Sequence, residues 1–520
     1  MKEIISNLLA QHLKKDVSSV VSLVEVPQDS TNGDYAFPCF TLSKELKKSP
    51  MDIAQNISSK LKLPKELEKI EAKGPYLNFF VNRSLLAQQT LKKILKEENL
   101  YGSSKVGKGK TTVIDMSSPN IAKPFGIGHL RSTMIGNALA NMGKSQGYNV
   151  VKINYLGDWG TPFGKIIAAY REFGDPKEFK KNPIPHLYEM YVRASKDASF
   201  EEKGRNWFKR LSNGDKEAIA LWKEFKKESL KEFEKIYTLL GVSFDVITGE
   251  SEYEEFIPQI VKELKSKGLL KEDQGAQIVD LEEYNLGVCL IQKSDGTTLY
   301  TTRDIALAIQ RYKKYKFAQM LYEVGSEQKL NFQQLFKVLE LMGYAWAKNC
   351  VHVAHGLYLD HDGKKFATRK GKTVFMEDIL LETVELAKKE ILKRGEISQK
   401  EVEERAITIA RAAIAYGDLK NYHEQNAIFD IDRFLSFEGD TGPYLLYTYA
   451  RAQSILAKVK KEKKISQFPN ISDKEKQLVI HLTKFSEVVN SAYHSFAPNL
   501  IANYAFQLAQ SFNEFYHSHQ

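Results

Sequence analysis

The stretch Thr111-Thr112-Val113-Ile114-Asp115-Met116 decides the fold, together with the loop after it, Ser117-Ser118-Pro119-Asn120-Ile121-Ala122-Lys123-Pro124-Phe125-Gly126-Ile127-Gly128-His129. The first six residues are rich in β-branched side chains and predict a short strand. Residues 129–143 carry apolar side chains at helical spacing, and residues 150–155 predict another strand. Strand, loop, helix and strand make a βαβ unit, so the sequence predicts a parallel sheet of Rossmann type.

The rest of the chain predicts further domains around this unit. Residues 1–108 mix helical and strand-like patterns and end in a glycine- and lysine-rich linker, which predicts a small α/β domain. Residues 109–384 form the Rossmann-type domain, with a charged helical insertion at about 166–240. Residues 385–520 predict an all-helical domain. The expected class is α/β, with a small α/β N-terminal domain and a helical C-terminal domain.

Composition excludes disordered and membrane-embedded classes. The chain has 520 residues, too many for one core, with 42% hydrophobic and 27% charged residues. Its net charge of +10 suits a polyanionic partner, and is equally compatible with a merely basic protein.

Three scattered cysteines, Cys39, Cys289 and Cys350, imply neither a disulfide framework nor a zinc site. The N-terminus has no signal-peptide pattern, and no apolar run approaches the roughly 18 residues that span a bilayer. We therefore expect a cytoplasmic protein without a membrane partner.

The loop at residues 117–128, here named the first signature loop, predicts a phosphate site. It joins a strand to a helix N-terminus, where free N–H groups and the helix dipole favour an anion. Gly128 would let an adenine ring lie against the backbone, and His129 can donate to a phosphate. A bare G-x-G-H is more often an ordinary turn with a capping histidine.

The longer string S-S-P-N-I-A-K-P-F-x-x-G-H-L-R-S-T resembles the signature of the arginyl-tRNA synthetases, with the Gly-His of the class I "HIGH" motif at Gly128-His129. The family usually has a histidine, which helps to hold the ATP phosphates, where this chain has Gly126. The resemblance implies that ATP is bound by Pro124, Gly126, Ile127, Gly128 and His129, with Gly128 and His129 also catalytic.

Residues 362–372, D-G-K-K-F-A-T-R-K-G-K, are named here the second signature segment. They are similar to the family's K-M-S-T-R-K-G variant of "KMSKS", with Phe366 for methionine and Ala367 for serine. The resemblance implies catalytic roles for Lys365, Arg369 and Lys370, and for Lys123 in place of the missing motif lysine. Standing alone, such a run is more often a solvated basic loop.

A site for arginine should offer carboxylates and acceptors in the plane of the guanidinium group. Tyr300 and Asp304 lie four residues apart on a predicted helix and share a face, although spacing alone fits a surface pair equally well. The resemblance implies that Tyr300, Asp304 and Gln328 meet the arginine side chain, and that Asp115, Ser118 and Asn120 hold its amino and carboxylate groups. Two further matching turns, residues 156–161 and 249–251, are expected only to line the site.

Two segments imply tRNA contacts. Residues 437–451 resemble the family's anticodon-binding helical domain, with Tyr449 and Arg451 as expected contacts. Tyr444 and Tyr447 in the same segment fit helix packing equally well. Asn32 and Tyr35 resemble part of the module that binds the tRNA elbow.

The expected function is that of an arginyl-tRNA synthetase. It would activate L-arginine with ATP and Mg²⁺ and load it onto the 3′-terminal adenosine of tRNA(Arg), as a monomer without a dedicated protein partner, protein metal ligands or an editing site. The family usually continues into a further helical hairpin, so we expect a truncated C-terminal domain. The alternatives are a tRNA-binding relative that has lost catalysis, and a nucleotidyltransferase of the same superfamily that acts on a small molecule.

Overall fold

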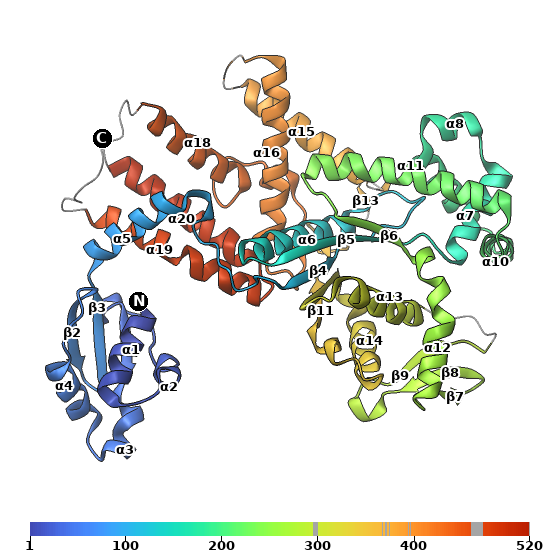
Figure 1. Ribbon diagram of the computed structural model, residues 1–520. Helices are drawn as coiled ribbons and strands as arrows, with labels where there is room; N and C mark the ends of the chain where they lie inside the picture. Colours follow the sequence, from blue (N-terminus) through green and yellow to red (C-terminus); the bar gives the residue numbers. More distant parts are fainter. Residues whose placement is uncertain are drawn as a thin grey trace. The chain divides into compact units, whose positions relative to one another are not determined.

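The computed structural model describes residues 1–294, 300–366, 368–369, 372–373, 375–393, 395, 397–458 and 472–518 (Figure 1). The chain divides into two compact units. The larger contains Gly102–Ala457 and Ser486–Phe506, and the smaller contains Met1–Tyr101, Lys458–Phe485 and Gln507–Gln520. The predicted boundaries at 108 and 384 stay predictions.

A five-stranded parallel sheet forms the centre of the larger unit. Its strands are β4 (Thr111–Asp115), β5 (Asn149–Leu156), β6 (Val246–Gly249), β10 (Gln319–Gly325) and β11 (Cys350–His355), in the order β11-β10-β4-β5-β6. The predicted βαβ unit and Rossmann-type sheet are confirmed. Because all five strands run the same way, their carboxyl ends meet at one edge, where ligands bind in open α/β sheets.

Helix α6 (Ile127–Ser145) follows β4 and contributes Leu130, Ile135 and Leu139 to the main core. The predicted insertion comprises α7 (Thr161–Phe173), α8 (Pro176–Lys181), α9 (Pro183–Ala194), α10 (Ser199–Ser212) and α11 (Lys216–Leu240). Asp215 caps α11 by accepting from the Ala218 N–H at 2.9 Å, and Gly241, with φ 70°, ends it. Because Phe225, Phe233 and Ile236 of α11 are buried in the main core, this helix is part of the Rossmann-type domain's packing.

A second excursion separates β6 from β10. It contains α12 (Ile257–Ser266), a three-stranded antiparallel sheet of β7 (Lys271–Asp273), β8 (Ala276–Asp280) and β9 (Val288–Gln292), and α13 (Tyr300–Tyr315). The strand-like runs at 277–279 and 288–291 are confirmed as strands, but they belong to this small sheet. Helix α14 (Lys329–Leu341) joins β10 to β11.

The C-terminal part is helical, as predicted. It contains α15 (Met376–Leu392), α16 (Gln399–Leu419), α17 (Ile431–Phe434), α18 (Gly442–Lys458), α19 (Asp473–His494) and α20 (Asn499–Ser518). Short strand pairs accompany them, β12 (Tyr358–Leu359) with β15 (Ala427–Ile428) and β13 (Thr368–Arg369) with β14 (Lys372–Thr373).

The N-terminal residues form a separate small core. Its antiparallel sheet has the order β1-β3-β2, from β1 (Tyr35–Pro38), β2 (Leu67–Lys73) and β3 (Tyr76–Val81). The helices are α1 (Lys2–Leu13), α2 (Val17–Val21), α3 (Ser43–Leu46), α4 (Pro50–Lys60) and α5 (Arg83–Glu97). A side chain at Gly33, with φ 92°, would meet the Phe79 carbonyl oxygen at 2.8 Å, so this close approach requires glycine. In the part of the chain that the structure describes, no helix is long and apolar enough to cross a membrane.

Candidate active site

The first signature loop leaves β4 at the carboxyl edge with an unusual backbone. Ser117, Ser118 and Ala122 have φ angles of 74°, 48° and 56°, a region that costs a residue with a Cβ about 1–2 kcal/mol. Neighbouring side chains hold each of them: the N–H groups of Ser117, Ser118 and Ala122 donate to Ser132 Oγ (2.9 Å), Asn154 Oδ1 (3.2 Å) and Ser229 Oγ (2.8 Å). Backbone strain maintained in this way is concentrated at functional sites.

His129 lies in the first turn of α6. Its Nδ1 accepts the Gly126 N–H at 3.1 Å, and its ring packs on Phe125 with centroids 5.2 Å apart. Burial lowers the pKa of His129 to about 4, so the ring is neutral near pH 7. Since Nδ1 accepts, the proton is on Nε2, which leaves Nε2–H free to donate to an anion at the helix N-terminus.

The glycines of this turn leave space. Among the described residues outside the adjoining backbone, no heavy atom lies within 4 Å of where a Cβ on Gly128 would be, and a Cβ on Gly126 would meet His129 Nδ1 alone, at 3.7 Å. Packing therefore does not require glycine at Gly126, where the family usually has histidine. Pro124 is half-buried and Ile127 is buried, so both shape the turn.

Lys123 is the cation of the first signature loop. Its Nζ lies 4.5 Å from the ring centroid of Tyr191 on α9, a cation–π contact. The ammonium group is thus placed by the helical insertion.

A buried ion pair lies directly below the loop. Asp115, the last residue of β4, accepts from Arg311 Nη1 at 2.6 Å through Oδ2 and from Ser118 Oγ at 3.0 Å through Oδ1. The two charged side chains are 5% and 1% exposed. Arg311 lies between the rings of Tyr155 and Tyr322, and its Nε and Nη2 have no acceptor among the described residues.

Arg311 is a site residue that was not predicted from the sequence. It follows Asp304 by seven residues on α13, so the two share a face of the helix, and this spacing could have identified it. Asp115 and Ser118 are brought together as predicted.

Two further carboxylates meet at the same edge. Asp304 accepts a hydrogen bond from Asn331, and Glu250, directly after β6, lies 3.6 Å from Arg303 Nη1. Burial raises the pKa of Asp304 to about 6 and that of Glu250 to about 7. The Asp115 carboxylate adds to the rise at Asp304, and the Asp304 carboxylate adds to the rise at Glu250. These half-buried carboxyl groups supply negative charge at the carboxyl edge of the sheet, which suits a cation. Glu250 was predicted only to line the site.

The other predicted arginine ligands are placed as follows. Tyr300 begins α13 one turn before Asp304, but its side chain lies outside the described residues. Gln328 is exposed at the start of α14, after β10. Asn120 packs so closely against Gly157 that a Cβ added to Gly157 would lie 2.0 Å from Asn120 Oδ1.

Asp158 links the two turns that resemble the family, residues 156–161 after β5 and residues 249–251 after β6. Its buried carboxylate accepts from Ser251 N–H and Oγ, both at 2.9 Å, and from Lys226 Nζ at 2.7 Å. These contacts hold both segments as tight turns at the site.

The second signature segment begins in a hairpin. Lys365 is exposed, and its backbone forms an isolated antiparallel β-bridge with Leu359. Phe366 packs on Phe429 with ring centroids 5.3 Å apart. Ala367, Lys370 and the Arg369 side chain lie outside the described residues. Just after the segment, the Met376 N–H donates to the Phe125 carbonyl at 3.2 Å. This backbone hydrogen bond links the residues that follow the second signature segment to the first signature loop.

The predicted tRNA contacts lie on other elements. Tyr449 of α18 is 64% exposed, and Arg451 donates to Tyr447 Oη at 2.9 Å. Tyr444 packs on Phe506, so packing accounts for Tyr444. In the N-terminal core, Asn32 accepts from Lys73 Nζ at 2.7 Å, and Tyr35 pairs with Phe79 across the sheet.

Models of known protein families match three parts of the chain. The model of the class I (R) tRNA synthetase catalytic domain covers residues 90–431. The chain belongs to the arginyl-tRNA synthetase family. Models of the arginyl-tRNA synthetase N-terminal domain and the DALR anticodon-binding domain match residues 1–81 and 445–520.

Relatives and solved structures agree with this membership. The chain is 45% identical to an arginine–tRNA ligase of Clostridium botulinum over 524 residues, which is 100% of this chain and 92% of the relative. It is 44% identical to one of Halothermothrix orenii, with 100% and 93% covered. The solved arginyl-tRNA synthetase of Thermus thermophilus, 24% identical, has a TM-score of 0.80 and shares the fold over 100% of this chain and 92% of that one.

Proposed function

We propose that the protein is an arginine–tRNA ligase: it activates L-arginine with ATP and transfers the arginyl group to tRNA(Arg). The observation that carries the proposal is the convergence at one sheet edge of the α6 N-terminus, the neutral His129 and the half-buried carboxyl groups of Asp304 and Glu250. One part suits a phosphate and the other a guanidinium cation.

In the first step the α-carboxylate oxygen of arginine attacks the α-phosphorus of ATP, and pyrophosphate leaves. We assign His129 Nε2–H to a phosphate oxygen on the departing side. Lys123, Lys365, Arg369 and Lys370 are assigned to the negative charge that develops there. In the second step a terminal ribose hydroxyl of tRNA attacks the carbonyl carbon of the adenylate, and AMP leaves.

The arginine substrate is assigned to the groups at the sheet edge. Asp304 and Glu250, with Tyr300 and Gln328, would pair with the guanidinium fork. Asp115, Ser118 and Asn120 would hold the amino and carboxylate groups. An analogue without the charged fork would leave these carboxyl groups unpaired, so the arginine site alone can reject it by about 10⁴-fold, and no editing site is required.

Several finer assignments belong to the same proposal. We assign Mg²⁺ to the phosphates of ATP, because Mg²⁺ is usually bound through substrate phosphates. Asn32, Tyr35, Tyr449 and Arg451 are assigned to tRNA. We further propose a cytoplasmic monomer with functional domains at 1–108, 109–384 and 385–520.

The test is arginine-dependent exchange between pyrophosphate and ATP, measured with and without tRNA(Arg) and with lysine as the control amino acid. We expect exchange with arginine only, and only when tRNA is present. Binding of tRNA without exchange would instead support a relative that has lost catalysis. Exchange with a small molecule that tRNA does not affect would support the nucleotidyltransferase.

A further inference from the structure

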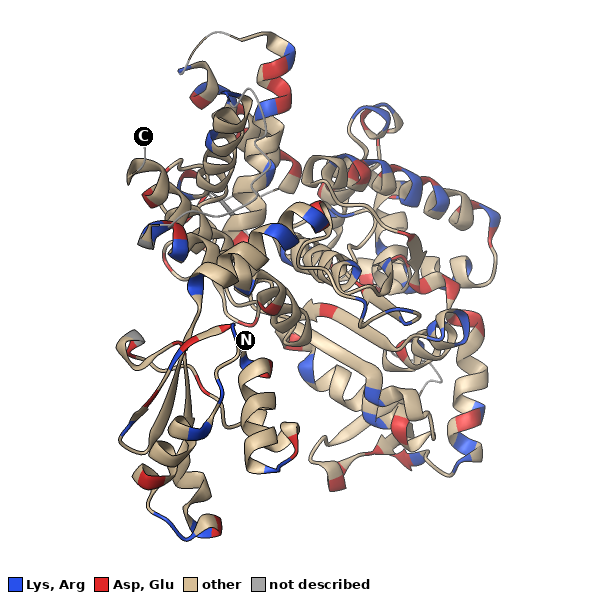
Figure 2. Cartoon of the chain, turned by 60° about the vertical axis from the view of Figure 1, so that its left-hand side comes forward, with Lys and Arg blue, Asp and Glu red and all other residues tan. Residues whose placement is uncertain are grey.

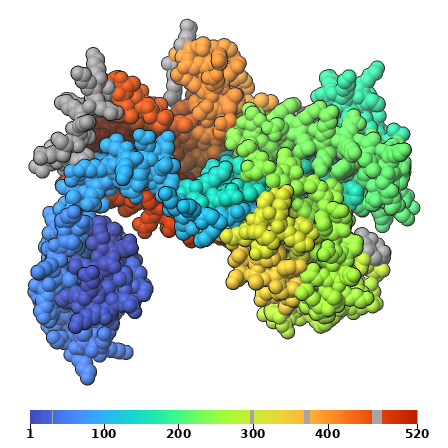
Figure 3. All heavy atoms as spheres, in the orientation of Figure 1, coloured from blue at the N-terminus to red at the C-terminus, as the bar shows by residue number. Residues whose placement is uncertain are grey.

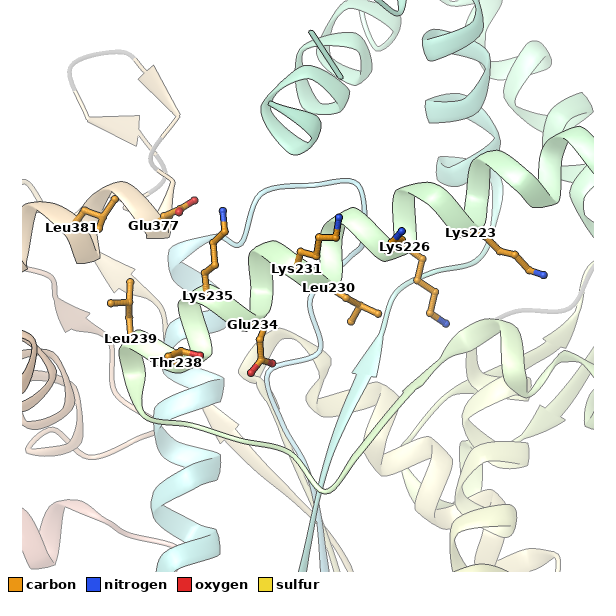
Figure 4. Close-up of a pocket in the computed structure, with 11 residues that line it drawn as sticks. Lys223, Lys226, Leu230, Lys231, Glu234, Lys235, Thr238, Leu239, Glu377 and Leu381 are labelled. Carbon is orange, nitrogen blue, oxygen red and sulfur yellow. The ribbon is translucent and has the colours of Figure 1, made fainter. Parts of the chain in front are cut away.

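A groove lies outside the active site, between α11 and α15. Its volume is about 940 Å³. Figure 4 shows its α11 side chains along the helix, and Figure 3 shows residues of α11 at the surface. The lining consists of five lysines, two glutamates and four other residues: Lys223, Lys226, Lys227, Lys231, Lys235, Glu234, Glu377, Leu230, Thr238, Leu239 and Leu381.

Four of these lysines form a regular row. Lys223, Lys227, Lys231 and Lys235 follow one another every fourth residue, and all are exposed. At 1.5 Å per residue the row is about 18 Å long. In the described part of the chain Lys231 pairs with Glu228 at 2.7 Å, whereas the other three form no ion pair.

Helix stability explains the lysine row only in part, because Glu224, Glu228 and Glu232 lie three residues before Lys227, Lys231 and Lys235 and offset some of its charge. Like charges four residues apart destabilise a helix by about 0.2–0.5 kcal/mol per pair. Basic and acidic residues are interspersed over most of the chain (Figure 2), but the groove gathers five lysines against two glutamates. Among the described residues Lys226 and Lys231 pair with Asp158 and Glu228, which leaves three lysines of the groove without an ion pair. A site with this excess of positive charge favours a polyanion.

The groove is adjacent to the catalytic loop. On the buried side of α11, Ser229 Oγ accepts the Ala122 N–H at 2.8 Å, and Tyr237 Oη lies 2.8 Å from Ser117 Oγ. The other wall, α15, starts at Met376, whose N–H donates to the Phe125 carbonyl. Both walls of the groove therefore hold the first signature loop.

We infer that the lysine row binds the sugar–phosphate backbone of the tRNA acceptor arm, the part of the tRNA whose end must reach this loop. The inference rests on the proposed function. The row, about 18 Å long, is long enough to meet several successive phosphates of an RNA strand. Lysine binds phosphate as a point charge, so these contacts position the RNA without reading its sequence.

The test is a triple variant, Lys227→Gln, Lys231→Gln and Lys235→Gln, compared with a control that removes three exposed lysines at α12, Lys262→Gln, Lys265→Gln and Lys267→Gln. We expect the groove variant to bind tRNA(Arg) at least about tenfold more weakly at low salt. The slope of log affinity against log salt should become shallower by about 2 to 3. KM values for ATP and arginine should not change.

Two RNA fragments locate the contact. The groove variant should lose affinity for an acceptor-arm minihelix but keep its affinity for an anticodon-arm hairpin. The corresponding Lys→Arg triple variant should bind both RNAs as the wild type does, and thermal unfolding should show that all variants are folded.

Three results would overturn the inference while the wild type still charges tRNA: equal tRNA binding by the groove and control variants, a loss confined to the anticodon hairpin, or a loss of binding only to anionic phospholipid vesicles. A wild type that binds tRNA but never aminoacylates it would refute the proposed function instead.

Discussion

The buried pair of Arg311 and Asp115 gives the sharpest test of the site. Arg311→Met removes the guanidinium charge but keeps a long unbranched side chain, so Asp115, 5% exposed, loses its cation. Breaking a buried ion pair in this way costs about 3–5 kcal/mol. The larger unit has about 380 residues, and its unfolding entropy is about 0.8 kcal/mol per kelvin. The melting temperature of that unit should therefore fall by about 4–6 °C.

Calorimetry measures this shift, and arginine-dependent exchange measures the effect on the site. The KM for arginine should rise at least about tenfold because Asp115 and Ser118 lose their anchor, while the KM for ATP should stay the same. The matched control is Arg171→Met, whose pair with Glu217 is exposed, so its melting temperature should shift by no more than about 1 °C.

The double variant Arg311→Met with Asp115→Asn should regain part of the lost stability, because it removes the uncompensated charge. If Arg311→Met melts within about 1 °C of the wild type, or if the double variant is no more stable than the single one, the pair does not hold the site.

Four further predictions concern the active site. His129→Ala should lower the exchange rate by about 10²-fold with little change in the KM for arginine, because a preorganised phosphate donor is lost, and an intact rate would exclude this role. Lys123→Ala should be comparably damaging in the same assay, whereas Lys372→Ala should not, and equally mild effects would mean that the charge is diffuse. As the pH falls from 7.5 to 5.5, kcat/KM for arginine should decrease, because Asp304 and Glu250, with pKa values of about 6 and 7, become protonated and no longer attract the guanidinium group. Asp304→Asn should lower kcat/KM by about 10²-fold or more at pH 7.5 and reduce the remaining pH dependence; a wild-type profile that is flat over this range would contradict the assignment.

The parallel sheet could be predicted because its evidence is local. β4, α6 and β5 follow each other with short connections, and each has the periodicity of its own class. Residues 277–279 and 288–291 were also recognisable as strands, but a short apolar run does not indicate which strands it pairs with. Their assignment to the small antiparallel sheet of β7, β8 and β9 required the structure.

The supports of the site could not be predicted. Asp115 and Arg311 are 196 residues apart, and Ala122 and Ser229 are 107 apart, so no local pattern relates them. The sequence of the insertion predicts charged helices. Its periodicity does not show that Ser229, a buried serine of α11, holds the first signature loop. Glu250 was visible within a matching turn, but a turn alone does not show that its carboxylate faces Asp304.

The left-handed residues of the first signature loop limit how far this motif can be moved between proteins. A designer who grafted residues 111–133 onto another Rossmann-type sheet would carry Ser132, which holds Ser117, but would leave behind Asn154 and Ser229. Ser118 and Ala122 would then relax to ordinary backbone angles, each releasing about 1–2 kcal/mol. Lys123, next to Ala122, would turn away with them. A working graft has to include β5 and α11 as well, so the smallest transferable part is a packed assembly of two strands and two helices.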